Sequence, residues 1–141
     1  MAALPRAIGL GINLSVAQLA DRDLRGRIAL ILEQAGVPPQ QLTVEITERD
    51  TLARRAGGGR VAPERTLLEL HQLGASLALD DFGTGYSSLT HIRRFPLRTL
   101  KIDRAFVAGA ADHAEDRAVI AAMVGMAAAL GLSVVGEAVE R

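Results

Sequence analysis

The feature that most constrains the fold of this chain is the alternation of short strand-like runs with longer helical stretches. Strands that alternate with helices predict a parallel sheet, either open or closed into a barrel. A closed barrel of this kind needs eight strands and roughly 250 residues, whereas the chain has 141 residues. We therefore predict an α/β fold, either a small complete domain or part of a barrel. The strand-like runs are residues 8–14, 42–47, 76–79, 99–102 and 133–135.

Three predicted helices separate these runs, and each has recognisable end signals. Pro63 suits the first turn of the second helix, because its missing N–H needs no partner there. Asp112 is expected to cap the N-terminus of the third helix. Glycine readily adopts the left-handed conformation found after a helix, so glycines are expected to end all three. These are Gly36, Gly74 and Gly131.

Composition excludes several classes of protein. The chain has no cysteine, which rules out disulfides, thiol nucleophiles and thiolate-bound zinc. Its 16 basic and 16 acidic side chains balance, whereas nucleic-acid and membrane-surface binders usually carry a basic excess. We therefore expect no nucleic-acid polymer as a partner. No apolar run reaches membrane-spanning length and no convincing signal peptide is present, so we expect a cytoplasmic location.

Residues 54–62 are expected to form a flexible surface insertion. Three successive glycines, Gly57 to Gly59, disfavour any regular element, and the neighbouring arginines keep the segment solvated. A phosphate-binding loop is the alternative, but the spacing matches neither a P-loop nor a dinucleotide-binding fingerprint.

Two adjacent aspartates, Asp80 and Asp81, directly follow the third strand-like run. Neighbouring carboxylates repel each other and cost free energy to desolvate. A bound divalent metal would compensate for this cost. A solvated turn is the alternative, because Asp and Gly are ordinary turn residues. The pair alone leaves both interpretations open.

Side chains alternate across a strand, so each strand-like run separates its aliphatic residues from its polar ones. In the first four runs the aliphatic residues share one face, and in all five a polar residue lies on the other face near the carboxyl end; in the last, Ser133, Val135 and Glu137 share that face. In α/β folds, ligands bind at the carboxyl ends of the strands. We therefore expect one site built from Asn13, Glu45, Asp80, Lys101 with Asp103, and Glu137.

These residues have the chemistry of a divalent-metal site. Their carboxylate and amide oxygens suit Mg²⁺, Mn²⁺ or Ca²⁺ rather than a soft metal. Five acids, with Asp81 included, against one lysine leave a local charge of −4, which calls for two divalent cations. Two such ions can bind a phosphodiester and activate a water near neutral pH. Lys101 would then hold that water or neutralise phosphate charge; its alternative is a structural ion pair with Asp103 or Asp81.

Several segments of the sequence together resemble one known family, the EAL domains. These are bacterial phosphodiesterases that hydrolyse the second messenger cyclic di-GMP to linear pGpG. The resemblance runs from about Ile12 to the C-terminus and implies a TIM-type barrel that holds two Mg²⁺ or Mn²⁺ ions. It also implies cyclic di-GMP as a partner and a homodimer for the intact domain. The matching segments are Asn13–Ser15, Glu45–Glu48, Asp80–Leu89, Leu100–Asp103 and Gly136–Glu140.

The resemblance implies roles for single residues as well. Asn13, Glu45 and Asp80 match metal ligands of the family, and Asp81 matches a ligand of the second metal. Lys101 matches the lysine that orients the attacking water. The remaining matches are Glu137, a carboxylate at the metal centre that can serve as base; Glu48, which steadies the loop after Asp81; and the substrate or loop residues Phe82, Gly83, Thr84, Gly85 and Asp103.

The chain also departs from the family pattern. The Glu-Ala-Leu motif that names the family should precede Asn13 and has no match, and the last barrel strands should follow Arg141. We therefore expect residues 1–141 to be a partial EAL domain, an incomplete barrel of about five strand–helix units. By resemblance it is a cyclic di-GMP phosphodiesterase, impaired or inactive as an isolated chain. The alternative is a degenerate domain that binds cyclic di-GMP or a protein partner without cleaving it.

Overall fold

The computed structural model of the chain describes residues 8–47, 62–82 and 89–137. Its centre is a parallel sheet whose spatial order, β1-β2-β3-β4-β5, follows the sequence. Consecutive strands of this kind, joined by right-handed crossovers, are the arrangement found in a TIM-type barrel. The predicted α/β fold, a partial barrel, is confirmed. The strands are β1 (Leu10–Asn13), β2 (Leu42–Thr47), β3 (Ser76–Phe82), β4 (Leu97–Ile102) and β5 (Ser133–Gly136).

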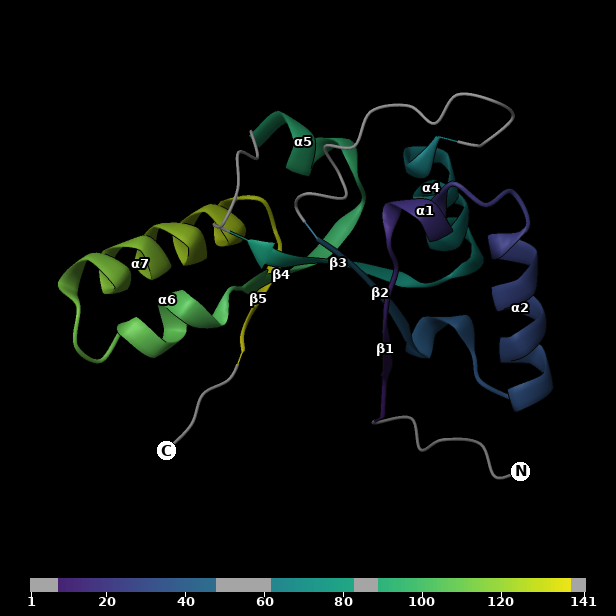
Figure 1. Cartoon of the computed structure of the whole chain (residues 1–141), viewed down its shortest axis with the longest axis horizontal. Helices are drawn as coiled ribbons and strands as arrows, with labels where there is room; N and C mark the ends of the chain where they lie inside the picture. Colours follow the sequence, from purple (N-terminus) through teal and green to yellow (C-terminus); the bar gives the residue numbers. More distant parts are fainter. Residues whose placement is uncertain (1–7, 48–61, 83–88, 138–141) are drawn as a thin grey trace.

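Helices pack at both ends of the sheet. Helices α1 and α2 pack against α4, which contacts β3, on the side of the sheet that holds β1 and β2, whereas α6 packs against α7, which contacts β5 (Figure 1). Among the described helices, none is long and apolar enough to cross a membrane. Their bounds are α1 (Val16–Leu19), α2 (Leu24–Ala35), α4 (Pro63–Leu73), α5 (Leu89–Arg94), α6 (Arg104–Gly109) and α7 (Ala114–Ala129), with a short 3-10 helix at Pro39–Gln41.

The hydrophobic core lies between the sheet and the helices. The aliphatic residues that alternate along β2, β3 and β4 are buried, as the period of two predicts. Leu67 and Leu70 of α4 are also buried and join the same core as Ile28 and Leu32 of α2. The aliphatic face of β2, β3 and β4 is thus removed from water, and the polar residues lie on the opposite face.

The predicted helix ends are confirmed for α2 and α4. Gly36 and Gly74 follow these helices with φ of 67° and 119°, in the left-handed region that favours glycine. The prediction that Asp112 caps the third helix is wrong by one residue, because His113 occupies the cap position of α7. The backbone N–H groups of Asp112 and His113 both donate to the Gly109 carbonyl, so a turn after α6 delays the start of α7.

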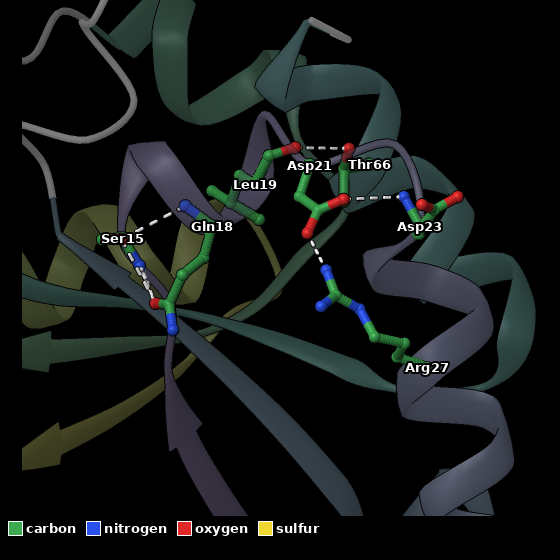
Figure 2. A network of polar contacts seen from close by, with 7 residues as sticks. All are labelled: Ser15, Gln18, Leu19, Asp21, Asp23, Arg27 and Thr66. Atoms are coloured by element: carbon green, nitrogen blue, oxygen red, sulfur yellow. Dashed lines mark hydrogen bonds and ion pairs between the residues drawn. The ribbon is translucent and has the colours of Figure 1, made fainter.

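A polar network ties the segment after β1 to helix α4 (Figure 2). Ser15 and Gln18 form a capping box at the start of α1. The Thr66 hydroxyl, in the first turns of α4, donates to the Leu19 carbonyl at 2.6 Å. Thr66 is the buried polar side chain of the described core, at 2% exposure. The bond therefore gives a partner to both the Thr66 hydroxyl and the Leu19 carbonyl, which are buried away from water. Asp21 and Arg27 form an ion pair on the neighbouring surface.

Candidate metal and phosphate site

Strand register brings the predicted polar residues to one face of the sheet. Asn13 of β1 pairs with Glu45 of β2, and Thr47 of β2 pairs with Asp80 of β3. Residues paired in a parallel sheet point to the same side, so Asn13, Glu45 and Asp80 share the face opposite the aliphatic core. Lys101 lies on the corresponding side of β4, between buried Leu100 and Ile102. The predicted separation of polar and aliphatic faces is confirmed for β1 to β4, whereas in β5 Val135 pairs with Lys101 and lies on the polar face.

A β-bulge directs Asp80 and Asp81 toward the same place. Leu79 pairs with Leu100 and Phe82 with Ile102, so Asp80 and Asp81 together oppose the single residue Lys101. Two residues on one strand against one on its partner define a bulge, which is common next to functional sites. Asp81 has φ of 54°, in the left-handed region that Asp tolerates better than most residues. The turn interpretation of this pair is wrong, because both aspartates belong to β3.

Three carboxylates converge on one point. Asp80, Asp81 and Glu137, the residue after β5, each offer an oxygen, and these atoms lie within 4.8 Å of one another. All three side chains are partly buried. Adjacent strand residues ordinarily point to opposite faces, and the bulge is what lets both aspartates join Glu137.

Lys101 is the cation at the centre of this acidic region. Its Nζ lies 2.9 Å from Oε2 of Glu45 and 2.5 Å from Oε1 of Glu137. The side chains of Lys101 and Glu45 are each 16% exposed and that of Glu137 is 31% exposed, so water screens these ion pairs only in part. We expected a structural ion pair as one alternative for Lys101. The structure bears out the ion pair and identifies Glu45 and Glu137 as partners, where the sequence had pointed to Asp81 and Asp103.

The site shifts two pKa values in the same direction for different reasons. Burial alone would lower the pKa of Lys101, but its hydrogen bonds with Glu137 and Glu45 outweigh burial and raise it. Burial raises the pKa of Asp80, with further contributions from Glu137 and Asp81. The Asp81 N–H, which donates to Oδ1 of Asp80 at 2.9 Å, and the charge of Lys101 partly offset that increase. Lys101 therefore stays charged at neutral pH and acts as a hydrogen-bond donor.

The other predicted site residues divide into two groups. Asp103 caps helix α6, where its Oδ1 accepts from the Ala105 N–H at 2.7 Å. Phe82 ends β3 and is partly buried against the core. Glu48, Gly83, Thr84 and Gly85 lie outside the described residues, as does most of the insertion expected at 54–62.

Two features of the site were missed from the sequence. The bulge at Asp80 and Asp81 was missed because it depends on register with β4, although two adjacent polar residues at a strand end are a weak signal for one. The second is Gly11, which lies on the site face of β1, opposite Thr43 and close to the Glu45 side chain.

The donor set fits a divalent cation. Carboxylate oxygens are the preferred ligands of Mg²⁺, Mn²⁺ and Ca²⁺, and the three that converge here carry more negative charge than one lysine offsets. Glu45 and Asn13 add oxygens on the neighbouring strands. The residues present are therefore compatible with a metal centre at this edge of the sheet.

Comparisons with known proteins identify relatives of the chain. The family model for the EAL domain matches residues 1–141. The cyclic di-GMP phosphodiesterase RocR of Pseudomonas aeruginosa is 37% identical over 140 residues, which are 99% of this chain and 34% of RocR.

Solved structures agree with this match. The EAL domain of Mycobacterium smegmatis DcpA superposes with a TM-score of 0.83 at 36% identity, over 96% of this chain and 59% of that one. Klebsiella pneumoniae BlrP1, in a manganese and cyclic di-GMP complex, gives a TM-score of 0.80 at 32% identity, over 94% of this chain and 33% of BlrP1. The chain thus spans less than two thirds of the length of each of these relatives.

Proposed function

The chain belongs to the EAL domain family, and from that premise we propose that its site takes part in the metal-dependent hydrolysis of cyclic di-GMP to linear pGpG. The observation that carries the proposal is the convergence of three carboxylates beside a doubly paired lysine at the carboxyl ends of β3, β4 and β5. RocR, a relative at 37% identity, is a cyclic di-GMP phosphodiesterase. This class of substrate fits a site that combines hard oxygen ligands with a fixed positive charge.

We propose that the site holds two divalent cations, Mg²⁺ or Mn²⁺. Asn13, Glu45 and Asp80 are the proposed ligands of one ion, with Glu137 at the same centre, and Asp81 is the proposed ligand of the other. The bound ions would lower the pKa of a water and withdraw charge from the phosphodiester. The BlrP1 complex with manganese and cyclic di-GMP supports this choice of metal and ligand.

The residues of the chain supply positioning and proton transfer. Lys101 is protonated at neutral pH, as an ordinary lysine is, so it is suited to donate a hydrogen bond to the attacking water or to a phosphate oxygen. Glu137, 2.5 Å from Lys101, is the proposed acceptor of the proton that the water loses. The water oxygen forms the new bond to phosphorus, the bond from phosphorus to the ribose 3′-oxygen breaks, and that oxygen takes up one proton, which balances the proton that the water gives to Glu137. The product is linear pGpG.

Turnover by the full chain tests the proposal. The purified 141-residue chain is incubated with Mn²⁺ and cyclic di-GMP, and linear product is measured by anion-exchange chromatography. We expect slow formation of pGpG that Glu45→Ala reduces by at least about tenfold, the usual effect of removing a group that supports a metal site. Glu33→Ala, which removes an exposed acid of α2, is the matched control and should leave the rate unchanged.

The outcomes separate the alternatives. Cyclic di-GMP that binds without turnover would refute hydrolysis by this chain and favour the binding-only alternative. Turnover that survives Glu45→Ala would refute the proposed ligand set. The roles proposed for Glu48, for Phe82 with Gly83, Thr84 and Gly85, and for Asp103, together with the homodimer and the cytoplasmic location, stay predictions.

A further inference from the structure

A side chain at position 11 would crowd the Glu45 carboxylate. Gly11 lies in β1 two residues before Asn13, which pairs with Glu45, so Gly11 and Glu45 share one face of the sheet as diagonal neighbours. A Cβ atom added to Gly11 would lie 3.1 Å from Oε1 of Glu45 and 3.8 Å from its Cδ. The first of these distances is shorter than ordinary van der Waals contact. Glycine inside a strand often marks such a close approach.

The Glu45 carboxylate has little freedom to move away from such an atom. Its second oxygen, Oε2, accepts from Lys101 Nζ at 2.9 Å, and its side chain is 16% exposed. Lys101 is held in turn by Glu137 at 2.5 Å. A displacement of Glu45 by a few tenths of an ångström would therefore either lengthen its ion pair or move Lys101 relative to Glu137.

We propose that Gly11 is a positioning residue. Because it has no side chain, the Glu45 carboxylate can keep the position in which it would bind the metal. This inference rests on the proposed function, because it takes Glu45 as a metal ligand. The backbone does not require glycine here, since among the described glycines only Gly36, Gly74 and Gly131 have a positive φ. In the folded state, the effect of a substitution at Gly11 would therefore come through the added side chain, and the Gly9 and Gly26 variants control for the change that alanine makes in the unfolded chain.

The role of Gly11 can be tested by measuring both the Mn²⁺ affinity and the stability of the chain. Mn²⁺ binding by the full chain is measured by isothermal titration calorimetry for the wild type and Gly11→Ala, and unfolding by urea is measured in EDTA. We expect Gly11→Ala to weaken Mn²⁺ binding about tenfold without loss of the folded state. Gly9→Ala, whose Cβ would meet only the Gln41 carbonyl at 3.5 Å, and Gly26→Ala, with nothing within 4 Å, should bind within about twofold of wild type.

A rescue variant separates positioning from a general structural effect. Glu45→Asp shortens the side chain and withdraws the carboxylate from position 11, so Gly11→Ala should cost no further Mn²⁺ affinity in that background. The two substitutions and their combination form a double-mutant cycle. Measured by urea unfolding without metal, this cycle should show that Gly11→Ala and Glu45→Asp are coupled by about threefold or more in the unfolding constant. Unchanged Mn²⁺ affinity in Gly11→Ala, or additive effects with Glu45→Asp, would overturn the proposal. If the wild type binds no Mn²⁺, the proposed function fails. The double-mutant cycle measured by urea unfolding without metal then decides whether Gly11 positions Glu45: coupling supports the role and additivity refutes it.

Discussion

Lys101 and Glu137 form the shortest ion pair of the site, with Nζ and Oε1 2.5 Å apart. The same ammonium group lies 2.9 Å from Glu45, so one side chain of β4 connects β2 with the residue that follows β5. Strands β2 and β5 are not neighbours in the sheet. In the metal-free chain, Lys101 is therefore the positive charge that offsets the acids collected on this face.

Replacing Lys101 should destabilise the metal-free chain. In Lys101→Met, Glu45 and Glu137 lose a shared partner while partly buried, and we expect a loss of about 1–3 kcal/mol in the free energy of unfolding. Mn²⁺ should recover more stability in the variant than in the wild type, because the cation replaces the missing charge. Urea unfolding with EDTA and with Mn²⁺ measures both effects.

Arg65→Met is the control for this substitution. Arg65 forms an exposed ion pair with Glu69 on α4, and such pairs contribute about 0.2–1 kcal/mol. Equal losses for Arg65→Met and Lys101→Met would contradict the role of Lys101 as the central cation of the site.

Asp80 should make the metal-free chain less stable at neutral pH. Burial raises its pKa above the ordinary value of 3.8, so the folded chain binds the proton more tightly than the unfolded chain does. Its ionisation therefore lowers the free energy of unfolding above the folded pKa, and this penalty disappears as the pH falls below 3.8. Asp80→Asn, which keeps an oxygen for the Asp81 N–H, should stabilise the chain in EDTA at neutral pH.

The pH dependence distinguishes this explanation from a general effect of removing charge. The advantage of Asp80→Asn should shrink as urea unfolding is repeated from neutral pH down to about pH 4. Glu33→Gln, at an exposed position of α2, serves as the control. The prediction would be wrong if Asp80→Asn were less stable than the wild type in EDTA at neutral pH.

The bulge should tolerate substitutions at Asp81 according to their backbone preference. Asp81 has φ of 54°, which glycine and asparagine adopt readily and β-branched residues avoid. Asp81→Gly and Asp81→Asn should therefore stay within about 1 kcal/mol of wild type in metal-free urea unfolding, whereas Asp81→Val should lose about 1–3 kcal/mol. Equal stability of the valine and asparagine variants would show that the left-handed conformation at this position carries no cost.

Sequence reasoning succeeded where the structure depends on local periodicity. Alternation along each strand was sufficient to assign Glu45, Asp80 and Lys101 to one face, because parallel strands in register keep paired residues on the same side. It failed where the structure depends on contacts between distant segments. The bulge at Asp81 arises from register with β4, and no spacing in the sequence specifies it.

The partners of Lys101 illustrate the same limit. The sequence led us to expect Asp103 or Asp81, whereas Glu45 and Glu137 come from elements that only the assembled sheet brings within reach of Lys101. Asp103 instead caps α6 through a contact two residues away, a role that its position before a helix could have indicated. Capping and site roles compete for the same residue types, so composition alone does not separate them.

Thr66 should stabilise the chain through a single buried hydrogen bond. Its hydroxyl donates to the Leu19 carbonyl at 2.6 Å and links α4 to the end of α1, which follows the β1 strand that carries Asn13 (Figure 2). Thr66→Val keeps the shape of the side chain but leaves that buried carbonyl without this donor, so we expect a loss of about 1–3 kcal/mol in urea unfolding. Thr66→Ser keeps the hydroxyl and should recover part of the loss. A valine variant as stable as wild type would show that another donor, such as water, replaces the threonine.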